Sequence, residues 1–357
     1  MSRLLWKDDW ERTRERFSAW WRREGMILAV TAPRAVPVED IPEPAAPADN
    51  TRFWTDPDYR LCKGESLMAR TYYGAEAFPC FDPEIGPGNL ATFIGSEPEY
   101  ARDTVWFNPC IDDPETHPAL CFDPNAPHYR RQMAIIEKAL SGSRERYLVG
   151  FPDLIENIDI LVSLRGMEKL LSDMLDRPAF VEERVAQINR IWFDVYERMR
   201  PRITDAWGGS TWACFHIWGQ GRTAKVQCDA SAAFSPSMFR RFVVPALSEQ
   251  CQWLDNALYH LDGQQCIVHL DALLAIDALD VIQWTAGAGR PGAGDPCWHE
   301  LYRRILAGGK GVMAAEVKPH EVIPLLDAVG PRGLFVQVNA ETEEQARGLE
   351  ERVDAYR

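Results

Sequence analysis

The chain has 357 residues, of which 46% are hydrophobic and 26% charged; this is the composition of a globular protein with one large core or two ordinary ones. Its 39 basic and 53 acidic residues give a net charge of −14, and this excess of acid argues against a protein that binds duplex DNA or RNA. There is no run of 18 apolar residues, so no segment is expected to cross a membrane.

The cysteines indicate a reducing compartment. They are scattered along the chain and form no CxxC pair, so neither a disulfide framework nor a Cys-rich zinc module is predicted. Lys7, Asp8 and Asp9 stand where a secretory signal would have its apolar segment. We therefore expect a soluble, cytoplasmic protein with free thiols.

The N-terminal part of the sequence predicts a helix, a strand and a long irregular segment. Apolar residues, several of them Trp, recur at spacings of three and four over the first 25 residues, which predicts an amphipathic helix. This helix is a candidate barrel cap or homodimer interface. The apolar run Met26–Thr31 predicts a strand, and the proline-rich residues 33–50 predict a surface loop.

From about residue 70, short apolar runs alternate with amphipathic stretches. Strands are predicted over 75–80, 147–151, 212–218, 257–261, 281–284, 311–316 and 334–338. Helices are predicted over 127–140, 166–200, 236–255, 267–276, 297–307, 320–329 and 341–356. Together with the strand at 26–31 this makes about eight strands in an α/β alternation, which predicts a (β/α)8 TIM barrel of parallel strands.

The predicted organisation is an N-terminal helical and loop extension over residues 1–70 and a barrel over 71–357, with residues 83–126 at one end of the barrel. An open doubly wound sheet is the alternative. The sequence has neither GxGxxG after the first strand nor GxxxxGK[ST], so nucleotide-binding versions of that sheet lose support.

The carboxyl ends of barrel strands are where active sites form, and the strand at 257–261 ends in the most informative group. His260 and Asp262 are two residues apart, so their side chains can point to the same side of the strand. They predict either a general acid/base pair, in which the carboxylate fixes the imidazole tautomer, or two ligands of a metal ion. A histidine bonded to carbonyls and an Asp that caps the next helix would explain the residues without a function.

Other strand ends supply further candidates. Glu316 ends an otherwise apolar strand and Asp229 lies in the loop before the helix at 236, which makes them candidate second carboxylates of a catalytic site. Trp218 and Trp284 are predicted as walls of a substrate pocket, with core packing as the alternative. The remaining predicted substrate contacts are Tyr259, His216, Gln283 and Asn339.

Four stretches carry a family resemblance over residues 145–357. They are Phe151-Pro-Asp-Leu leading to Leu164-Arg-Gly166, the helix Phe234-Ser-Pro-Ser-Met-Phe-Arg-Arg-Phe-Val-Val-Pro245, the strand end Tyr259-His-Leu-Asp-Gly263, and the last strands around Glu316. The second is similar to a Ser-Pro-x-x-Phe-x-x-Phe-x-x-Pro helix and the third to a strand ending in His-x-Cys-Gly. With these stretches the sequence resembles the uroporphyrinogen decarboxylase superfamily, which also contains corrinoid- and coenzyme M-dependent methyltransferases.

The resemblance implies a (β/α)8 barrel enzyme, with methyl transfer to or from a small molecule as the favoured reaction. Thiol-activating members hold zinc through the His and Cys of His-x-Cys; here the implied ligands are His260 and, at the Cys position, Asp262, for zinc or another divalent metal. The Asp-x-His-x-x-Gly pattern of corrinoid ligation is absent, so a corrinoid would be carried by a separate partner protein.

Two other functions stay open at this point. The Arg-rich segment typical of true uroporphyrinogen decarboxylases is missing from residues 1–40. A cofactor-free decarboxylase or lyase acting on a carboxylated small molecule would need cations at the barrel mouth, for which Arg222, Arg290 and Lys318 are the candidates. A non-catalytic small-molecule binding protein that kept the barrel is the other alternative.

Overall fold

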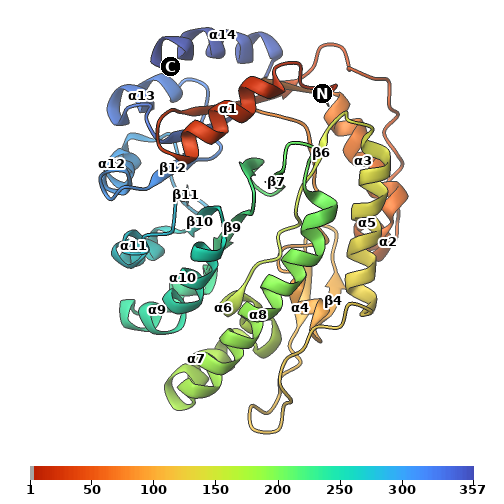
Figure 1. The fold of residues 1–357 in the computed structure, drawn as a ribbon, viewed down its shortest axis with the longest axis vertical. Coiled ribbons are helices and arrows are strands. Elements are labelled where there is room, and N and C mark those ends of the chain that lie inside the picture. The colour runs from red at the N-terminus through yellow and green to blue at the C-terminus, as the bar shows by residue number, and fades with distance from the viewer. Residues whose placement is uncertain (1–3) are drawn as a thin grey trace.

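The central element of the computed structural model, which describes residues 4–357, is a seven-stranded sheet (Figure 1). Its order is β2-β1-β13-β12-β11-β10-β9, and all neighbours are parallel except β2, which runs antiparallel to β1. The strands are β1 Ile27–Pro33, β2 Thr71–Ala75, β9 Thr223–Gln227, β10 Asn256–Asp262, β11 Val281–Thr285, β12 Gly311–Ala314 and β13 Leu334–Asn339. Residues 1–3 of the predicted first helix lie outside the described residues.

Short strands lie between the two edges of this sheet. β3 (Cys80–Phe81) pairs with β6 (Leu148–Val149) in parallel, and Phe151 forms a parallel bridge to Trp212 of β7 (Gly209–Trp212). β7 in turn contacts β9. This succession of mostly parallel strands is barrel-like, whereas closure into a continuous eight-stranded barrel remains a prediction.

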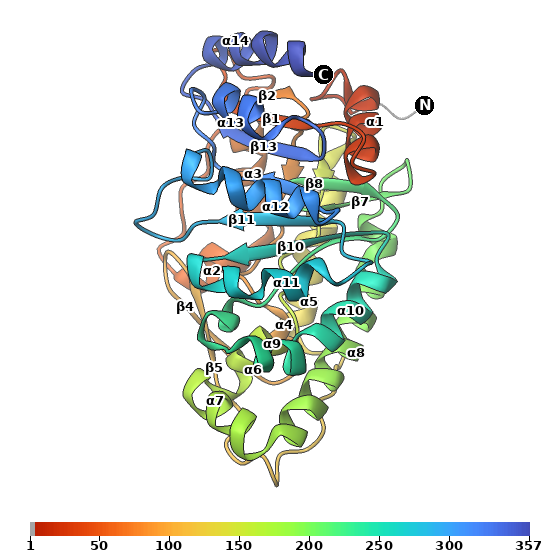
Figure 2. The ribbon, with the colours of Figure 1, turned by 90° about the vertical axis from the view of Figure 1, so that its left-hand side faces the viewer.

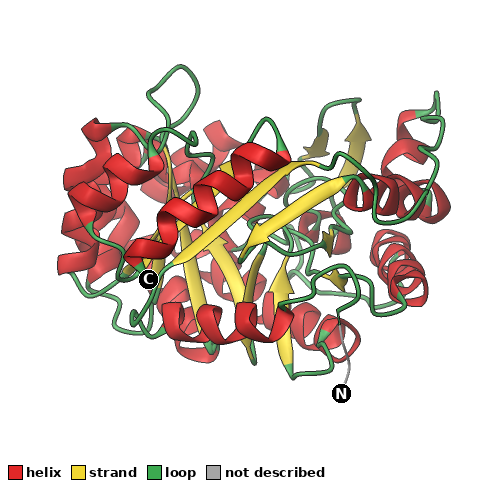
Figure 3. Cartoon of the chain, turned by 90° about the horizontal axis from the view of Figure 1, so that it is seen from above, coloured by secondary structure: helices red, strands yellow, loops and turns green. Residues whose placement is uncertain are grey.

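Helices surround the sheet, as the view from above shows (Figure 3). Those that follow the main strands are α9 Pro236–Phe242, α10 Val244–Trp253, α11 Leu270–Leu274, α12 His299–Ala307, α13 Val322–Val329 and α14 Glu343–Val353. The earlier ones are α1 Trp10–Trp21, α2 Asn50–Thr55, α3 Pro57–Ala69, α4 Leu90–Phe93, α5 Pro127–Ser143, α6 Asn157–Arg165, α7 Met167–Asp176 and α8 Pro178–Ile203. Among the described residues, none of these helices is long and apolar enough to span a membrane.

The strands predicted at 257–261, 281–284 and 334–338 are confirmed as β10, β11 and β13; β10 and β11 lie side by side in Figure 2. The single strand predicted over 212–218 is wrong, because a turn after Trp212 splits it into β7 and the antiparallel β8 (Ile217–Gln220). The single helix predicted over 166–200 is also wrong. It divides into α7 and α8 at Pro178, whose ring cannot continue a helix but suits its first turn.

Several elements were not predicted. Between the loop predicted over 33–50 and β2 the chain forms α2 and α3, for which no helix was predicted. A hairpin of β4 (Glu97–Tyr100) and β5 (Val105–Asn108) lies within residues 83–126, which were predicted to lie at one end of the barrel. β1 belongs to the predicted N-terminal extension, yet it is an interior strand of the sheet between β2 and β13. The boundary predicted at residue 70 therefore separates β1 from the strands with which it pairs.

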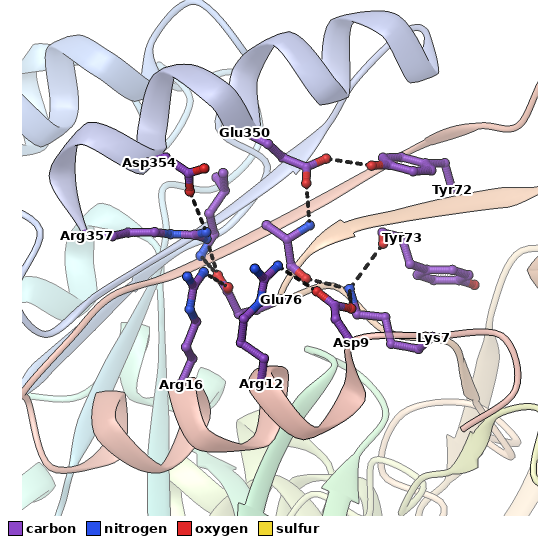
Figure 4. Close-up of polar contacts among 12 residues, drawn as sticks. Lys7, Asp9, Arg12, Arg16, Tyr72, Tyr73, Glu76, Glu350, Asp354 and Arg357 are labelled. Carbon is purple, nitrogen blue, oxygen red and sulfur yellow. Dashed lines mark hydrogen bonds and ion pairs between the residues drawn. The ribbon is translucent and has the colours of Figure 1, made fainter. Parts of the chain in front are cut away.

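A buried carboxylate joins both ends of the chain to the sheet (Figure 4). Glu76 is 1% exposed; it accepts a hydrogen bond from the amide of Leu28 on β1 and pairs with the guanidiniums of Arg16 on α1 and Arg357. Nearby, the ammonium of Lys7 donates to the carbonyl oxygen of Tyr73 at 3.3 Å. Because an isolated buried charge is costly, each of these groups depends on its partners.

We predict that Glu76→Ala lowers the free energy of unfolding by about 3 kcal/mol, since it leaves two guanidiniums and a strand amide without their acceptor. Urea denaturation monitored by circular dichroism measures this change. The exposed Glu351 provides a control, and Glu351→Ala should change stability by less than about 0.5 kcal/mol. Equal effects of the two substitutions would contradict the assigned role of Glu76.

Candidate active site

A cavity of about 760 Å³ opens at the carboxyl ends of β10 to β13, and we call it the mouth cavity. Its floor and walls come from the strand ends, from the Gly-rich loop after β11 and from the turn after β7. The residues that line it include Asp262, Trp284, Thr285, Arg290, Glu316, Gln337, Asn339, Cys214, Phe215 and His216. This position agrees with the rule that barrel-like folds place their chemistry at the carboxyl ends of strands.

β9 carries buried polar side chains on its interior face, the last of them at the same end of the sheet as the mouth cavity. Lys225 and Gln227 alternate with Ala224 and Val226, and all four are buried. Alternation of this kind places the polar pair on one side of the strand and the apolar pair on the other. Buried polar side chains on a core strand are stable only when each finds a partner.

Those partners form a chain of contacts. The ammonium of Lys225 pairs with Oδ2 of Asp153 at 2.6 Å and also donates to the side-chain oxygen of Gln227. Because that oxygen is engaged by the ammonium, the amide nitrogen of Gln227 is left to donate, and it bonds Oδ2 of Asp229 at 2.8 Å. The buried ammonium therefore orients the Asp229 carboxylate through one amide.

A second amide orients the imidazole of His260. Gln283 lies beside His260 in the β10–β11 register, and its amide nitrogen donates to Oγ1 of Thr285 at 2.9 Å. Its oxygen therefore faces Nδ1 of His260 and accepts that proton, so the lone pair of the neutral ring lies on Nε2. The sequence-based hypothesis that Asp262 fixes the tautomer is wrong; Gln283 does so.

The hydrogen bonds from Lys225 through Gln227 and those from Thr285 through Gln283 end at one three-residue cluster. One ligand atom each from Asp229, His260 and Asp262 lies within 4.8 Å of the other two, and Nε2 of His260 is 4.0 Å from Oδ1 of Asp229. Within residues 4–357, the carboxylate of Asp262 has neither a hydrogen bond nor an ion pair. We call this group the Asp229–His260–Asp262 cluster.

Burial and negative charge shape the electrostatics of the cluster. Burial raises the pKa of Asp229 to about 6, and the nearby carboxylates of Asp262 and Asp153 contribute to the increase. Burial also lowers the pKa of His260, and the ammonium of Lys225 lowers it further. The ring is therefore held neutral beside carboxylates whose charge is poorly compensated, which favours the arrival of a cation.

Asp159 supports the Asp229 backbone from α6. Its carboxylate accepts hydrogen bonds from the amides of Asp229 at 2.8 Å and Ala230 at 3.0 Å, the first residues of a short 3-10 helix over Asp229–Ala233. Burial, together with the Asp229 charge, raises the pKa of Asp159 to about 6. The sequence suggested Asp229 only as a loop residue, and these contacts explain how it is held at the end of β9.

The other predicted residues divide into two groups. His216, Glu316 and Asn339 line the mouth cavity, and Trp284 borders it with a fully buried indole that packs against Trp298. Glu316 and His216 have left-handed φ angles of 57° and 50°, which non-glycine residues rarely adopt outside sites that hold them in place. Tyr259 and Trp218 are 1% exposed and belong to the core. Trp218 donates to Asp205 and packs against Trp10, so it does not line this cavity.

The cations predicted for a lyase are dispersed. Arg222 precedes β9, at the end opposite the mouth, where it pairs with Glu197. Lys318 lies beside a neighbouring surface cavity, 4.0 Å from a carboxylate oxygen of Glu321. Only Arg290 of the three lines the mouth cavity.

Sequence reasoning did not find the residues that orient the cluster. Lys225, Gln227 and Asp159 were not assigned roles at the site, and β9 was not predicted as a strand. The sequence nevertheless contains a signal for β9, because polar and apolar residues alternate over 224–229. This is the period of two expected for a strand.

Comparisons with known proteins show the fold. No family model matches the sequence, and no curated protein is significantly similar to it. Eleven chains of solved structures match, among them a methyltransferase from Methanosarcina mazei with a TM-score of 0.63, over 96% of this chain and 98% of that one, at 10% sequence identity. The chain therefore shares the fold of a methyltransferase, and a fold by itself does not establish an activity.

We predict that Lys225→Met lowers the free energy of unfolding by about 3–5 kcal/mol, because the Asp153 carboxylate is left buried without its cation. The double variant Lys225→Met, Asp153→Asn should recover a large part of this loss, since it also removes the uncompensated charge. Urea denaturation of the two variants tests the coupling. If the double variant is as unstable as the single one, the ion pair does not carry the effect.

Proposed function

We propose that this protein is a methyltransferase related to the uroporphyrinogen decarboxylase superfamily, and that it transfers a methyl group to or from a small molecule bound in the mouth cavity. The observation that carries this proposal is the Asp229–His260–Asp262 cluster at the strand ends beside that cavity. The shared fold of the Methanosarcina mazei methyltransferase supports it, as does the helix and strand-end resemblance in the sequence.

The donor set of the cluster suits a divalent metal ion. One imidazole nitrogen and two carboxylate oxygens are ligands that zinc and similar ions accept. Ligands about 2.1 Å from one ion lie within about 4.2 Å of each other, so atoms that lie within 4.8 Å need only small side-chain rotations. Oriented partners behind His260 and Asp229 are what metal ligands require.

A bound divalent ion would supply a Lewis acid that favours the deprotonated, nucleophilic form of a methyl acceptor. The chain's own residues perform the remaining tasks. Gln283 keeps the Nε2 lone pair of His260 directed at the cluster, Gln227 holds Asp229, and Phe215 forms an apolar wall. A corrinoid, where one is used, would be brought by a separate partner protein.

The lyase alternative has less support. It needs several cations at the mouth cavity, around the carboxylate that would react, whereas Arg222 lies at the opposite end of the sheet and of the three predicted cations only Arg290 lines this cavity. An acid/base role of His260 with Asp229 nevertheless requires no metal. Metal content therefore separates methyl transfer at a metal site from acid/base chemistry at the same residues.

We predict near-stoichiometric zinc or another divalent metal in protein purified without chelator, and loss of that metal in Asp262→Ala. Elemental analysis by mass spectrometry measures both. Asp277→Ala, which removes an exposed carboxylate beyond α11, is the matched control and should retain the metal. Metal-free wild-type protein that also fails to take up added zinc would rule out this reading.

We predict that Gln283→Leu weakens metal binding about 10- to 100-fold, because the ring of His260 loses the acceptor that fixes its tautomer and direction. Competition with a chromophoric chelator gives the dissociation constant. Gln264→Leu replaces an exposed glutamine near β10 and should have no effect. Unchanged affinity in Gln283→Leu would show that Gln283 does not position the ligand.

A further inference from the structure

A second cavity, of about 560 Å³, adjoins the mouth cavity, and we call it the aromatic cavity. His216 lines both cavities. The walls of the aromatic cavity come from α2, α3, the turn between β4 and β5, and the adjoining ends of β1 and β2. These helices and the hairpin lie together on one side of the molecule in Figure 1.

Three cations line this cavity although the chain as a whole is strongly acidic. They are Arg60 and Lys63 from α3 and Arg102 from the β4–β5 turn. Within residues 4–357 none of the three forms an ion pair. Two carboxyl groups, of Asp82 and Asp103, also line the cavity, and Asp82 lies in the field of Arg60 without forming an ion pair with it.

Two of the three cations lie over one ring, that of Phe53. The guanidinium carbon of Arg102 lies 3.9 Å from the centre of the Phe53 ring, and the ammonium of Lys63 lies 4.6 Å from the same centre. Burial lowers the pKa of Lys63, and the positive charges of Arg60 and Arg102 lower it further. Like charges held this closely are stabilised by an anion.

The scaffold holds these cations in place. Arg60 donates to the carbonyl oxygens of Trp54 at 3.0 Å and Asp82 at 3.1 Å, and the indole of Trp54 donates to the carbonyl oxygen of Ala101 at 2.7 Å. The turn that carries Arg102 is therefore tied to α2. Lys63 has cation–π contacts but no hydrogen-bond partner among the described residues, so its three donors are free for a ligand.

The rest of the lining is mainly apolar and aromatic, with Phe53, Trp54, Leu67, Met68, Tyr73 and Phe81. We propose that the aromatic cavity binds an amphipathic anion: an apolar or aromatic body packed against these rings, with a carboxylate held by Lys63 and Arg102. Such a molecule would extend past His216 and present its reacting end to the Asp229–His260–Asp262 cluster. This inference deepens the proposed function and rests on it for the direction of the reacting end.

The probe is 4-methoxybenzoate, which has an aromatic body, a carboxylate and an O-methyl group. Isothermal titration of the full chain should give saturable binding, and 4-methoxybenzamide, which lacks the charge, should bind about tenfold more weakly. Acetate and inorganic phosphate, which lack the apolar body, should also bind at least about tenfold more weakly. Equal affinities for acid and amide, affinities for the simple anions as high as for the probe, or no binding at millimolar concentrations would overturn the proposal.

The matched variants are Lys63→Gln and Arg352→Gln, which remove the same charge from the cavity and from the exposed surface of α14. Lys63→Gln should weaken binding of 4-methoxybenzoate about tenfold and abolish the preference over the amide, whereas Arg352→Gln should leave both unchanged. Arg102→Gln should act as Lys63→Gln does. Its thermal melting is compared with wild type because Arg102 also bonds the carbonyl oxygen of Pro47. Unchanged affinity in Lys63→Gln overturns the assignment.

This experiment and the metal experiment fail independently. Asp262→Ala should lose the metal and keep binding of 4-methoxybenzoate, whereas Lys63→Gln should keep the metal and lose the tight binding. A metal-free wild type that binds the acid as expected would overturn the proposed function and leave the anion site standing. A metal-loaded wild type that binds 4-methoxybenzoate and 4-methoxybenzamide equally well would overturn the anion site and leave the proposed function standing.

Discussion

The arrangement at the mouth depends on one buried ammonium, that of Lys225, on the interior face of β9. Asp153, Glu156 and Asp229 all lie in its field, and without it their charges would only repel one another. Burial raises the pKa of Glu156 well above its usual range, and the Lys225 charge opposes this increase. The ammonium thus lets several carboxylates share a small interior space, and it gives Gln227 the orientation on which Asp229 depends.

Gln227 and Gln283 orient the side chains of Asp229 and His260. In each case one end of the amide is engaged, by Lys225 at Gln227 and by Thr285 at Gln283, so that the other end has a defined chemical character. One presents a donor to a carboxylate and the other an acceptor to an imidazole. A neutral amide transmits orientation without adding charge, which suits a site that already holds an excess of acid.

The sequence allowed the parallel strands β10, β11 and β13 to be predicted, because their apolar runs are long and bounded by clear helices. The sequence also predicted that His260 and Asp262 lie on the same side of their strand, because residues two apart on a strand point to the same face. β9 was missed because Lys225 and Gln227 are polar residues in a core strand, which only tertiary partners make stable. Trp218 was misplaced because the turn that reverses β8 depends on His216 adopting a left-handed backbone conformation, which residue type does not reveal.

The pairing of β1 with β13 has a consequence for synthesis of the chain. The hydroxyl of Thr31 and the side-chain oxygen of Asn339 that joins it are 308 positions apart. At about 5–20 residues per second, a ribosome needs on the order of 15 seconds to a minute to produce that partner. Throughout this time the apolar strand β1 has at least one unpaired edge, so the nascent protein would need protection from aggregation until β13 emerges.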